Sequence, residues 1–203
     1  MASQMQNKVC VITGGAGSIG AASAKLLRDE GAKVMLIDLH QAALQKTASD
    51  IGGEVAWCAA DVTKSDQVEN AIAATVERFG KIDVLFSNAG NFGTVAAIAD
   101  YPEDVFDSVL AVHVRGAFLC AKHAVPQMND GGSIIITSSV AGVTGDPGVY
   151  GYITAKHAPR RTDARTGQGV GRTQYPGEYR SSGSGRQFIS AWRRTKIGRS
   201  DRP

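Results

Sequence analysis

Cysteine is scarce in this sequence of 203 residues, and the three that occur, Cys10, Cys58 and Cys120, lie far apart. A metal site built on cysteine or histidine needs these residues at short, regular spacings, which the sequence does not contain. No metal centre is therefore expected. The odd number of thiols, all in or beside expected strands and helices, predicts buried free cysteines.

Long apolar runs are also missing. No stretch approaches the roughly 20 apolar residues that a helix needs to cross a bilayer, so no membrane association is expected. The N-terminal MASQMQNK has neither the charged start nor the apolar core of a secretory signal. We therefore expect a cytoplasmic protein. The length suits one globular domain.

Arginine is rare until the chain nears its end. Residues 1–156 hold three arginines within 11 basic and 16 acidic residues, a net charge of −5. Residues 157–203 hold ten arginines within 11 basic and 3 acidic residues, a net charge of +8. This change predicts a folded domain over 1–156 and a basic tail over 157–203. The tail is rich in Gly, Ser and Thr, and we expect most of it to be disordered.

Up to residue 156, short apolar runs alternate with helical patterns. The runs predict strands at 8–13, 33–38, 54–59, 82–87 and 133–138, and the patterns predict helices near 18–30, 41–51, 65–79 and 103–128. Ser65 is the expected N-cap of the third helix. This alternation predicts an α/β fold with a doubly wound, Rossmann-like parallel sheet. Strands beyond the fifth are not recognisable, so the C-terminal strands of such a sheet are apparently missing and its last edge is expected to be unpaired.

A glycine turn follows the first expected strand and opens the first helix. Gly15-Ala16-Gly17-Ser18-Ile19-Gly20 fits G-x-G-x-x-G, in which the missing side chains let a pyrophosphate approach the helix N-terminus. Asp38 closes the second strand 18 residues after Gly20, where a carboxylate binds adenosine ribose hydroxyls. A ligand-free turn and a helix-capping aspartate are the alternatives. Because a carboxylate repels the extra phosphate of NADP and no Lys or Arg is adjacent, NAD is the expected cofactor.

These and later motifs resemble those of the short-chain dehydrogenase/reductase family over residues 7–156. The matching positions are Thr13, Gly14, Gly15, Gly17, Ser18, Ile19 and Gly20 for the glycine motif, Asp61 and Val62 for the adenine contact, Asn88, Ala89 and Gly90 for the N-A-G motif, and Ser139, Tyr152 and Lys156 for catalysis. Ser18 stands where the family usually has the middle glycine.

The resemblance implies an NAD-dependent oxidoreductase that interconverts a small secondary alcohol and a ketone. Tyr152 and Lys156 are four residues apart, which places both on one face of a helix, where they would also contact the cofactor. A phenol ordinarily has a pKa near 10, and a neighbouring ammonium stabilises the phenolate that acts as base. Ser139 would orient the substrate oxygen. Tyr150 is not the expected base, because the residue four positions after it is Thr154, which carries no positive charge. The alternative is a non-catalytic remnant that retains nucleotide-binding motifs but lacks a substrate pocket.

His113 is a departure from the family pattern. It stands in Val112-His113-Val114-Arg115-Gly116, where the family usually has an asparagine that holds a water in the proton relay. A neutral imidazole can donate from one nitrogen and accept at the other, so His113 could hold this water. A packed histidine that weakens the relay is the other interpretation, and the sequence leaves both open.

The tail after Lys156 does not match the family. Pro159 falls where the helix carrying Lys156 should continue. A disrupted reading frame near residue 158 is the leading interpretation, ahead of a solvated extension. Binding of nucleic acid by the tail is the least favoured, because its aromatic residues lack regular spacing. Homo-oligomerisation of the family type is doubtful, since it uses late helices and strands that are not recognisable here.

Overall fold

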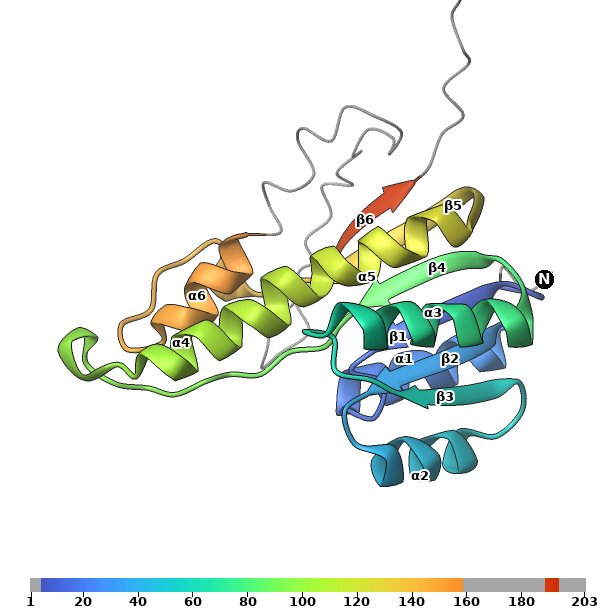
Figure 1. Ribbon diagram of the computed structural model, residues 1–203, viewed down its shortest axis with the longest axis horizontal. Coiled ribbons are helices and arrows are strands. Elements are labelled where there is room, and N and C mark those ends of the chain that lie inside the picture. The colour runs from blue at the N-terminus through green and yellow to red at the C-terminus, as the bar shows by residue number, and fades with distance from the viewer. Residues whose placement is uncertain (1–4, 159–188, 194–203) are drawn as a thin grey trace, which may run out of the picture.

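The computed structural model describes residues 5–158 and 189–193 (Figure 1). Five parallel strands form most of its sheet: β1 (Val9–Thr13), β2 (Lys33–Asp38), β3 (Val55–Ala59), β4 (Ile82–Ser87) and β5 (Met128–Thr137). Their order is β3-β2-β1-β4-β5, so the chain winds outward from β1 in one direction and then crosses to β4. This confirms the predicted doubly wound sheet, with its topological switch between β1 and β4.

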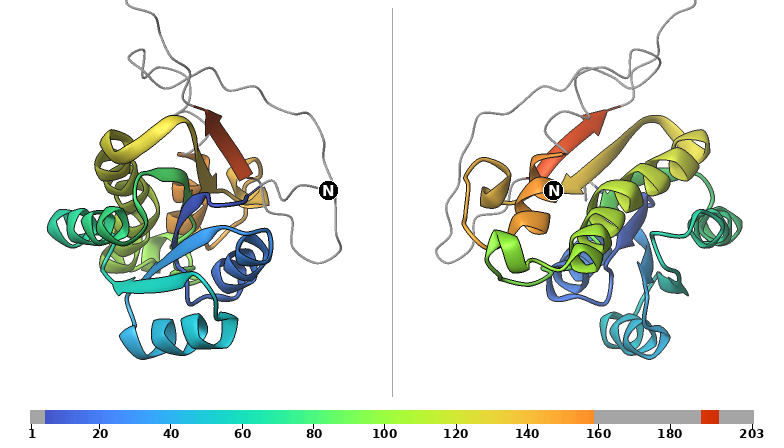
Figure 2. Two further views of the ribbon diagram at one scale, coloured as in Figure 1. Left: turned by 90° about the vertical axis from the view of Figure 1, so that its right-hand side faces the viewer. Right: turned by 60° about the vertical axis from the view of Figure 1, so that its left-hand side comes forward.

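Helices cover both faces of the sheet. They are α1 (Ser18–Asp29), α2 (Gln41–Ile51), α3 (Ser65–Phe79), α4 (Glu103–Leu110), α5 (Gly116–Ala124) and α6 (Tyr150–His157). Alternate residues of β1 point to opposite faces. Val9 and Val11 pack with α3 and α5, whereas Cys10 and Ile12 pack with α1 and α2. Figure 2 shows helices on both sides of the sheet. Because β1 to β5 pair in parallel, their carboxyl ends lie at one edge of the sheet.

The helix predicted over 103–128 has internal structure. A π-helical turn, η2 (Ala111–Arg115), joins α4 to α5, and a 3-10 turn, η3 (Val125–Gln127), follows α5. β5 then begins at Met128, five residues before the predicted start. The prediction misses Asn129–Gly132 because these residues are polar or glycine, and the pairing with β4 is irregular there.

Ser65 does not have the predicted capping role. Lys64 is the N-cap of α3, and Ser65 is the first helical residue. The Ser65 hydroxyl instead shares a hydrogen bond of 2.9 Å with Nε2 of His123 on α5. A contact with another helix therefore replaces the local cap.

The outer edge of β5 is paired, contrary to the prediction of an unpaired edge. β6 (Ile189–Arg193) lies antiparallel to β5, with Ile189 opposite Thr137 and Arg193 opposite Ser133. An exposed edge offers free N–H and C=O groups that any nearby extended segment can satisfy. The rest of the tail, 159–188 and 194–203, lies outside the described residues, so its disorder stays a prediction.

The described residues also locate the thiols. Cys10 and Cys120 are buried and Cys58 is partly exposed, and all three are free. Residues 5–158 and 189–193 contain no cluster of His, Cys, Asp or Glu suited to a metal ion. None of the helices in this part of the chain has both the length and the apolar character that crossing a membrane requires.

Candidate active site

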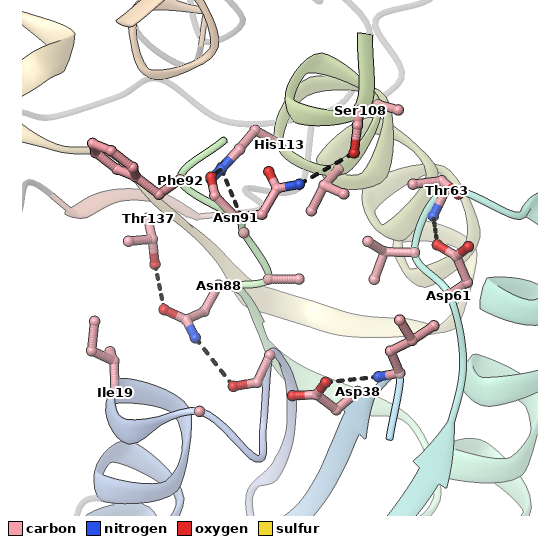
Figure 3. Close-up of a pocket in the computed structure, with 18 of the residues that line it drawn as sticks. Ile19, Asp38, Asp61, Thr63, Asn88, Asn91, Phe92, Ser108, His113 and Thr137 are labelled. Atoms are coloured by element: carbon pink, nitrogen blue, oxygen red, sulfur yellow. Dashed lines mark hydrogen bonds between the residues drawn. The ribbon is translucent and has the colours of Figure 1, made fainter. Parts of the chain in front are cut away.

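A cavity of about 870 Å³ opens at the carboxyl edge of the sheet, beside the switch point between β1 and β4 (Figure 3). Most of the predicted site residues line it: Gly14, Gly17, Ser18, Ile19, Asp38, Asp61, Val62, Asn88, Ala89, Gly90, His113, Tyr152 and Lys156. Thr13, Gly15, Gly20 and Ser139 are not among the lining residues. Open α/β sheets bind ligands at this edge, so the topology brings the predicted motifs together.

The glycine turn leaves the cavity open to an anion. A Cβ on Gly20 would overlap the carbonyl oxygen of Gly14, and a Cβ on Gly15 would lie 2.8 Å from Cβ of Leu36. A Cβ on Gly17 would make an ordinary contact, 3.4 Å from the Gly14 carbonyl oxygen, and Gly17 is the N-cap of α1, with no side chain capping the helix there. A helix N-terminus without a side-chain cap offers its N–H groups to an anion such as a pyrophosphate, so the residues present here are compatible with a dinucleotide.

Asp38 ends β2 and reaches back to the glycine turn. One carboxylate oxygen accepts the Ala16 N–H at 3.0 Å, and the other accepts the Leu39 N–H at 2.7 Å. His40 is the N-cap of α2 and no side chain caps that helix, so Asp38 is not a capping residue there. Asp38 thus holds the turn against β2 while its carboxylate faces the cavity. Its bond to Ala16 was not predicted from the sequence.

The N-A-G motif is connected to the glycine turn by side-chain hydrogen bonds. Oγ1 of Thr13 accepts the backbone N–H groups of Asn88 and Ala89, at 3.0 and 3.1 Å. The Asn88 amide accepts from the Thr137 hydroxyl at 3.0 Å and donates to the Gly14 carbonyl at 3.4 Å. Three strand ends are therefore fastened to one another beneath the cavity.

Tyr152 and Lys156 face the cavity from one side of α6, as their spacing predicts. The Tyr152 ring contacts Phe92 and His113, with centroid separations of 5.3 and 5.7 Å. Lys156 is only 4% exposed, and its Nζ lies 5.4 Å from the Tyr152 ring centroid and donates to the Thr137 carbonyl at 3.0 Å. Burial lowers the pKa of Lys156 to about 8. The side chain is still mostly an ammonium at neutral pH.

The end of α6 is held against the strand next to it. The buried Ser138 hydroxyl donates to the Lys156 carbonyl at 3.0 Å, so Lys156 is fixed through both its side chain and its backbone. α6 ends at His157, before Pro159, as the proline predicts. Tyr150 turns away from the cavity lining and packs edge-to-face on Tyr101.

Ser139 lies at the N-cap of a 3-10 turn, η4 (Val140–Gly142). Its Oγ accepts the Ala141 N–H at 3.2 Å. This local bond orients the hydroxyl, and Thr137 is the β5 residue that lines the cavity. Ser139 keeps its hydroxyl hydrogen as a donor.

His113 is a buried residue of η2, 7% exposed, whose ring lies against the Cα of Gly90. Its Nε2 is 2.8 Å from the Asn91 carbonyl and 3.1 Å from the Asn91 N–H. One ring nitrogen satisfies only one of these groups at a time, according to its tautomer. Burial, together with the charge of Lys156, lowers the pKa of His113 to about 4, so the ring is neutral at pH 7.

Sequence reasoning missed several lining residues, among them Asn91, Phe92, Ser108 and Thr137. Asn91 and Phe92 directly follow the N-A-G motif at the end of a parallel strand. Their position at the carboxyl edge was the signal that could have identified them. Ser108, on α4, carried no such signal, because only the tertiary structure brings α4 to the cavity.

Comparison with known proteins agrees with this geometry. Residues 8–167 match the family model described as short chain dehydrogenase. Short-chain dehydrogenase reductase 5 of Arabidopsis thaliana is 43% identical over 159 residues, which cover 76% of this chain and 61% of that protein. Short-chain dehydrogenase reductase 3a of the same plant is 42% identical over 159 residues, which cover 76% of this chain and 62% of that protein. The chain therefore spans about 61% of the length of these curated relatives.

Solved structures show the same likeness. NAD+-bound xylitol dehydrogenase is 37% identical with a TM-score of 0.74, over 79% of this chain and 64% of that one. Levodione reductase is 35% identical with a TM-score of 0.73, over 75% of this chain and 62% of its own. With the cavity, its glycine turn and the Tyr152–Lys156 pair in place, this chain belongs to the short-chain dehydrogenase family.

Proposed function

We propose that this protein is an oxidoreductase that interconverts a secondary alcohol and a ketone with NAD(H). The observation that carries the proposal is that Tyr152 and Lys156 open on the same cavity as the glycine turn and Asp38. A nucleotide-binding end and a proton-transferring end thus share one continuous space. The likeness to a xylitol dehydrogenase whose structure contains NAD+ supports the same assignment.

The chain offers a group for each part of NAD. The N-terminus of α1 at Gly17 would hold the pyrophosphate, Asp38 the adenosine ribose, and Asp61 with Val62 the adenine. Asn88–Gly90 and Tyr152 would flank the nicotinamide end. The bound cofactor would supply the hydride chemistry, with NAD⁺ as the acceptor in alcohol oxidation and NADH as the donor in ketone reduction. The negative charge of Asp38 opposes the additional phosphate of NADP.

Tyr152 would exchange the proton at the substrate oxygen. A phenolic oxygen acts as a base when a nearby positive charge stabilises its ionised form. Lys156 supplies this charge, and its bonds through Thr137 and Ser138 keep it beside Tyr152. The neutral His113 adds no second positive charge that would compete with Lys156. The remaining hydroxyl hydrogen of Ser139 would orient the substrate oxygen.

The test is NADH formation by the purified chain with a panel of cyclic, aliphatic and polyhydroxylated secondary alcohols, with NAD and NADP compared. Tyr152→Phe should abolish the reaction without preventing NADH binding. Tyr150→Phe is a matched control on the same helix and should keep wild-type turnover. Binding of NADH without turnover of any alcohol or ketone would contradict the proposal and favour a nucleotide-binding protein without catalytic activity.

A further inference from the structure

The Asp61–Ser65 segment follows β3 and includes Ser65, the first residue of α3, and it forms one wall of the cavity through Asp61, Val62 and Thr63. It is a local turn, in which the Asp61 carboxylate accepts the Thr63 N–H at 2.8 Å and the Asp61 carbonyl accepts the Lys64 N–H at 3.0 Å. A turn of this kind sets its own shape. Its position relative to the cavity depends on contacts with the rest of the molecule.

The Gln67 side chain of α3 accepts the Asp61 N–H at 2.8 Å, and three further contacts with the segment come from η2 and α5. The Arg115 guanidinium donates to the Thr63 carbonyl. Gly116 packs so closely on Val62 that a Cβ there would lie 2.9 Å from Cγ2 of the valine. At the far end of the segment, Ser65 and His123 share their 2.9 Å hydrogen bond.

The π turn η2 also reaches the catalytic end of the cavity. His113 lies against Gly90 and Tyr152, whereas Arg115, two residues later, contacts Thr63. π turns inside helices are frequent at functional sites, because the extra residue changes the directions in which side chains point. Here one turn contacts both ends of the cofactor cavity.

From these contacts we infer that Arg115 is a positioning residue for the adenine end of the cofactor site, acting through the Thr63 carbonyl. The inference rests on the proposed function. Arg115 is exposed at the surface and takes no part in the catalytic chemistry. It holds Asp61 and Val62 in place before the nucleotide arrives, which reduces the ordering cost of binding. His123 supports the same segment through Ser65.

Calorimetric binding of AMP, nicotinamide mononucleotide and NAD tests this role. Arg115→Ala should weaken the binding of AMP and the binding of NAD to a similar extent, by about three- to tenfold, as expected for one lost hydrogen bond. Binding of nicotinamide mononucleotide should not change, because that probe does not reach the segment. Arg115→Lys should restore part of the loss. In turnover, KM for NAD should rise while kcat stays at its wild-type value.

Lys122→Ala is the matched control, because it removes an exposed positive charge from α5, the helix that follows η2, and should leave all three affinities unchanged. The inference would be overturned if Arg115→Ala weakened the binding of AMP and of nicotinamide mononucleotide equally, or if it left the affinity for AMP unchanged. If Arg115→Ala does not fold, His123→Ala takes its place, and AMP affinity equal to wild type would then overturn it. If wild-type protein binds neither AMP nor NAD, the proposed function fails together with the inference. Wild-type binding without an Arg115 effect overturns only the inference.

Discussion

Replacing Lys156 with methionine should make the protein more stable at neutral pH while removing its proposed activity. Lys156 is a charged side chain held almost entirely out of water, 4% exposed beneath Tyr152. Methionine has a similar length and no charge to bury. The substitution therefore separates the energetic cost of this group from its chemical use.

The pKa of Lys156 gives the magnitude. Burial lowers it from 10.5 to about 8, and each pKa unit corresponds to about 1.4 kcal/mol. The buried ammonium thus costs the folded state on the order of 3 kcal/mol at neutral pH. Methionine leaves the Thr137 carbonyl without its hydrogen bond from Nζ, and this loss reduces the gain in stability by about 1 kcal/mol. The expected gain is about 1–3 kcal/mol in the free energy of unfolding.

The pH dependence is the sharper part of the prediction. Below about pH 8 the lysine is protonated in both the folded and unfolded states, so the full cost is present. Between about 8 and 10.5 the folded state releases this proton while the unfolded chain retains it, so the wild type gains stability as pH rises. The difference in the free energy of unfolding between Lys156→Met and the wild type should therefore decrease as pH rises from about 8 to 10.5.

Urea unfolding of both proteins over this pH range measures the difference. Contributions from the thiols cancel, because the two proteins share them. Lys122→Met, at an exposed position of α5, is the control and should show no such pH-dependent difference. A variant less stable than the wild type, with a difference independent of pH, would refute the reasoning.

Four further predictions concern other groups of the site and core. His113→Asn should raise NAD-linked turnover if His113 weakens the relay, and a large loss would show that the imidazole itself takes part. The pKa of His113 is about 4 in the folded state and 6.5 in the unfolded state, so the wild type should lose stability as pH falls from 6.5 to 4. Urea unfolding should show that His113→Gln lacks this part of the pH dependence. Asp38→Ala should weaken NAD binding about tenfold, reduce discrimination against NADP and free the Ala16 N–H; calorimetry that finds both affinities unchanged would remove Asp38 from the ribose site. Burial raises the pKa of Cys10 and Cys120 from 9.0 to about 12, so unfolding releases their protons above pH 9 and stability should fall there, with a smaller slope in Cys120→Ala.

Local patterns in the sequence were sufficient for much of the fold. Strands β1 to β4 and helices α1 to α3 agree with the predicted ranges to within one residue, because apolar periodicity and glycine ends are properties of neighbouring residues. β5 was predicted too short, because Asn129–Gly132 belong to the strand without any apolar pattern of their own, and the pairing with β4 is irregular there. β6 was missed, since it depends on the free edge of β5 more than on its own sequence.

For the site, the sequence by itself predicted the cofactor and catalytic motifs. It also determined that Tyr152 and Lys156 share a helix face, because four-residue spacing is a local property. Only the tertiary structure decided how these groups act on one another. Lys156 acquires its lowered pKa from burial by elements distant in sequence, and His113 meets Asn91 through the close approach of η2 to the end of β4. Arg115 reaches Thr63 across 52 residues of sequence. Burial and long-range contact depend on the packing of the whole chain, so no spacing within the sequence encodes them directly.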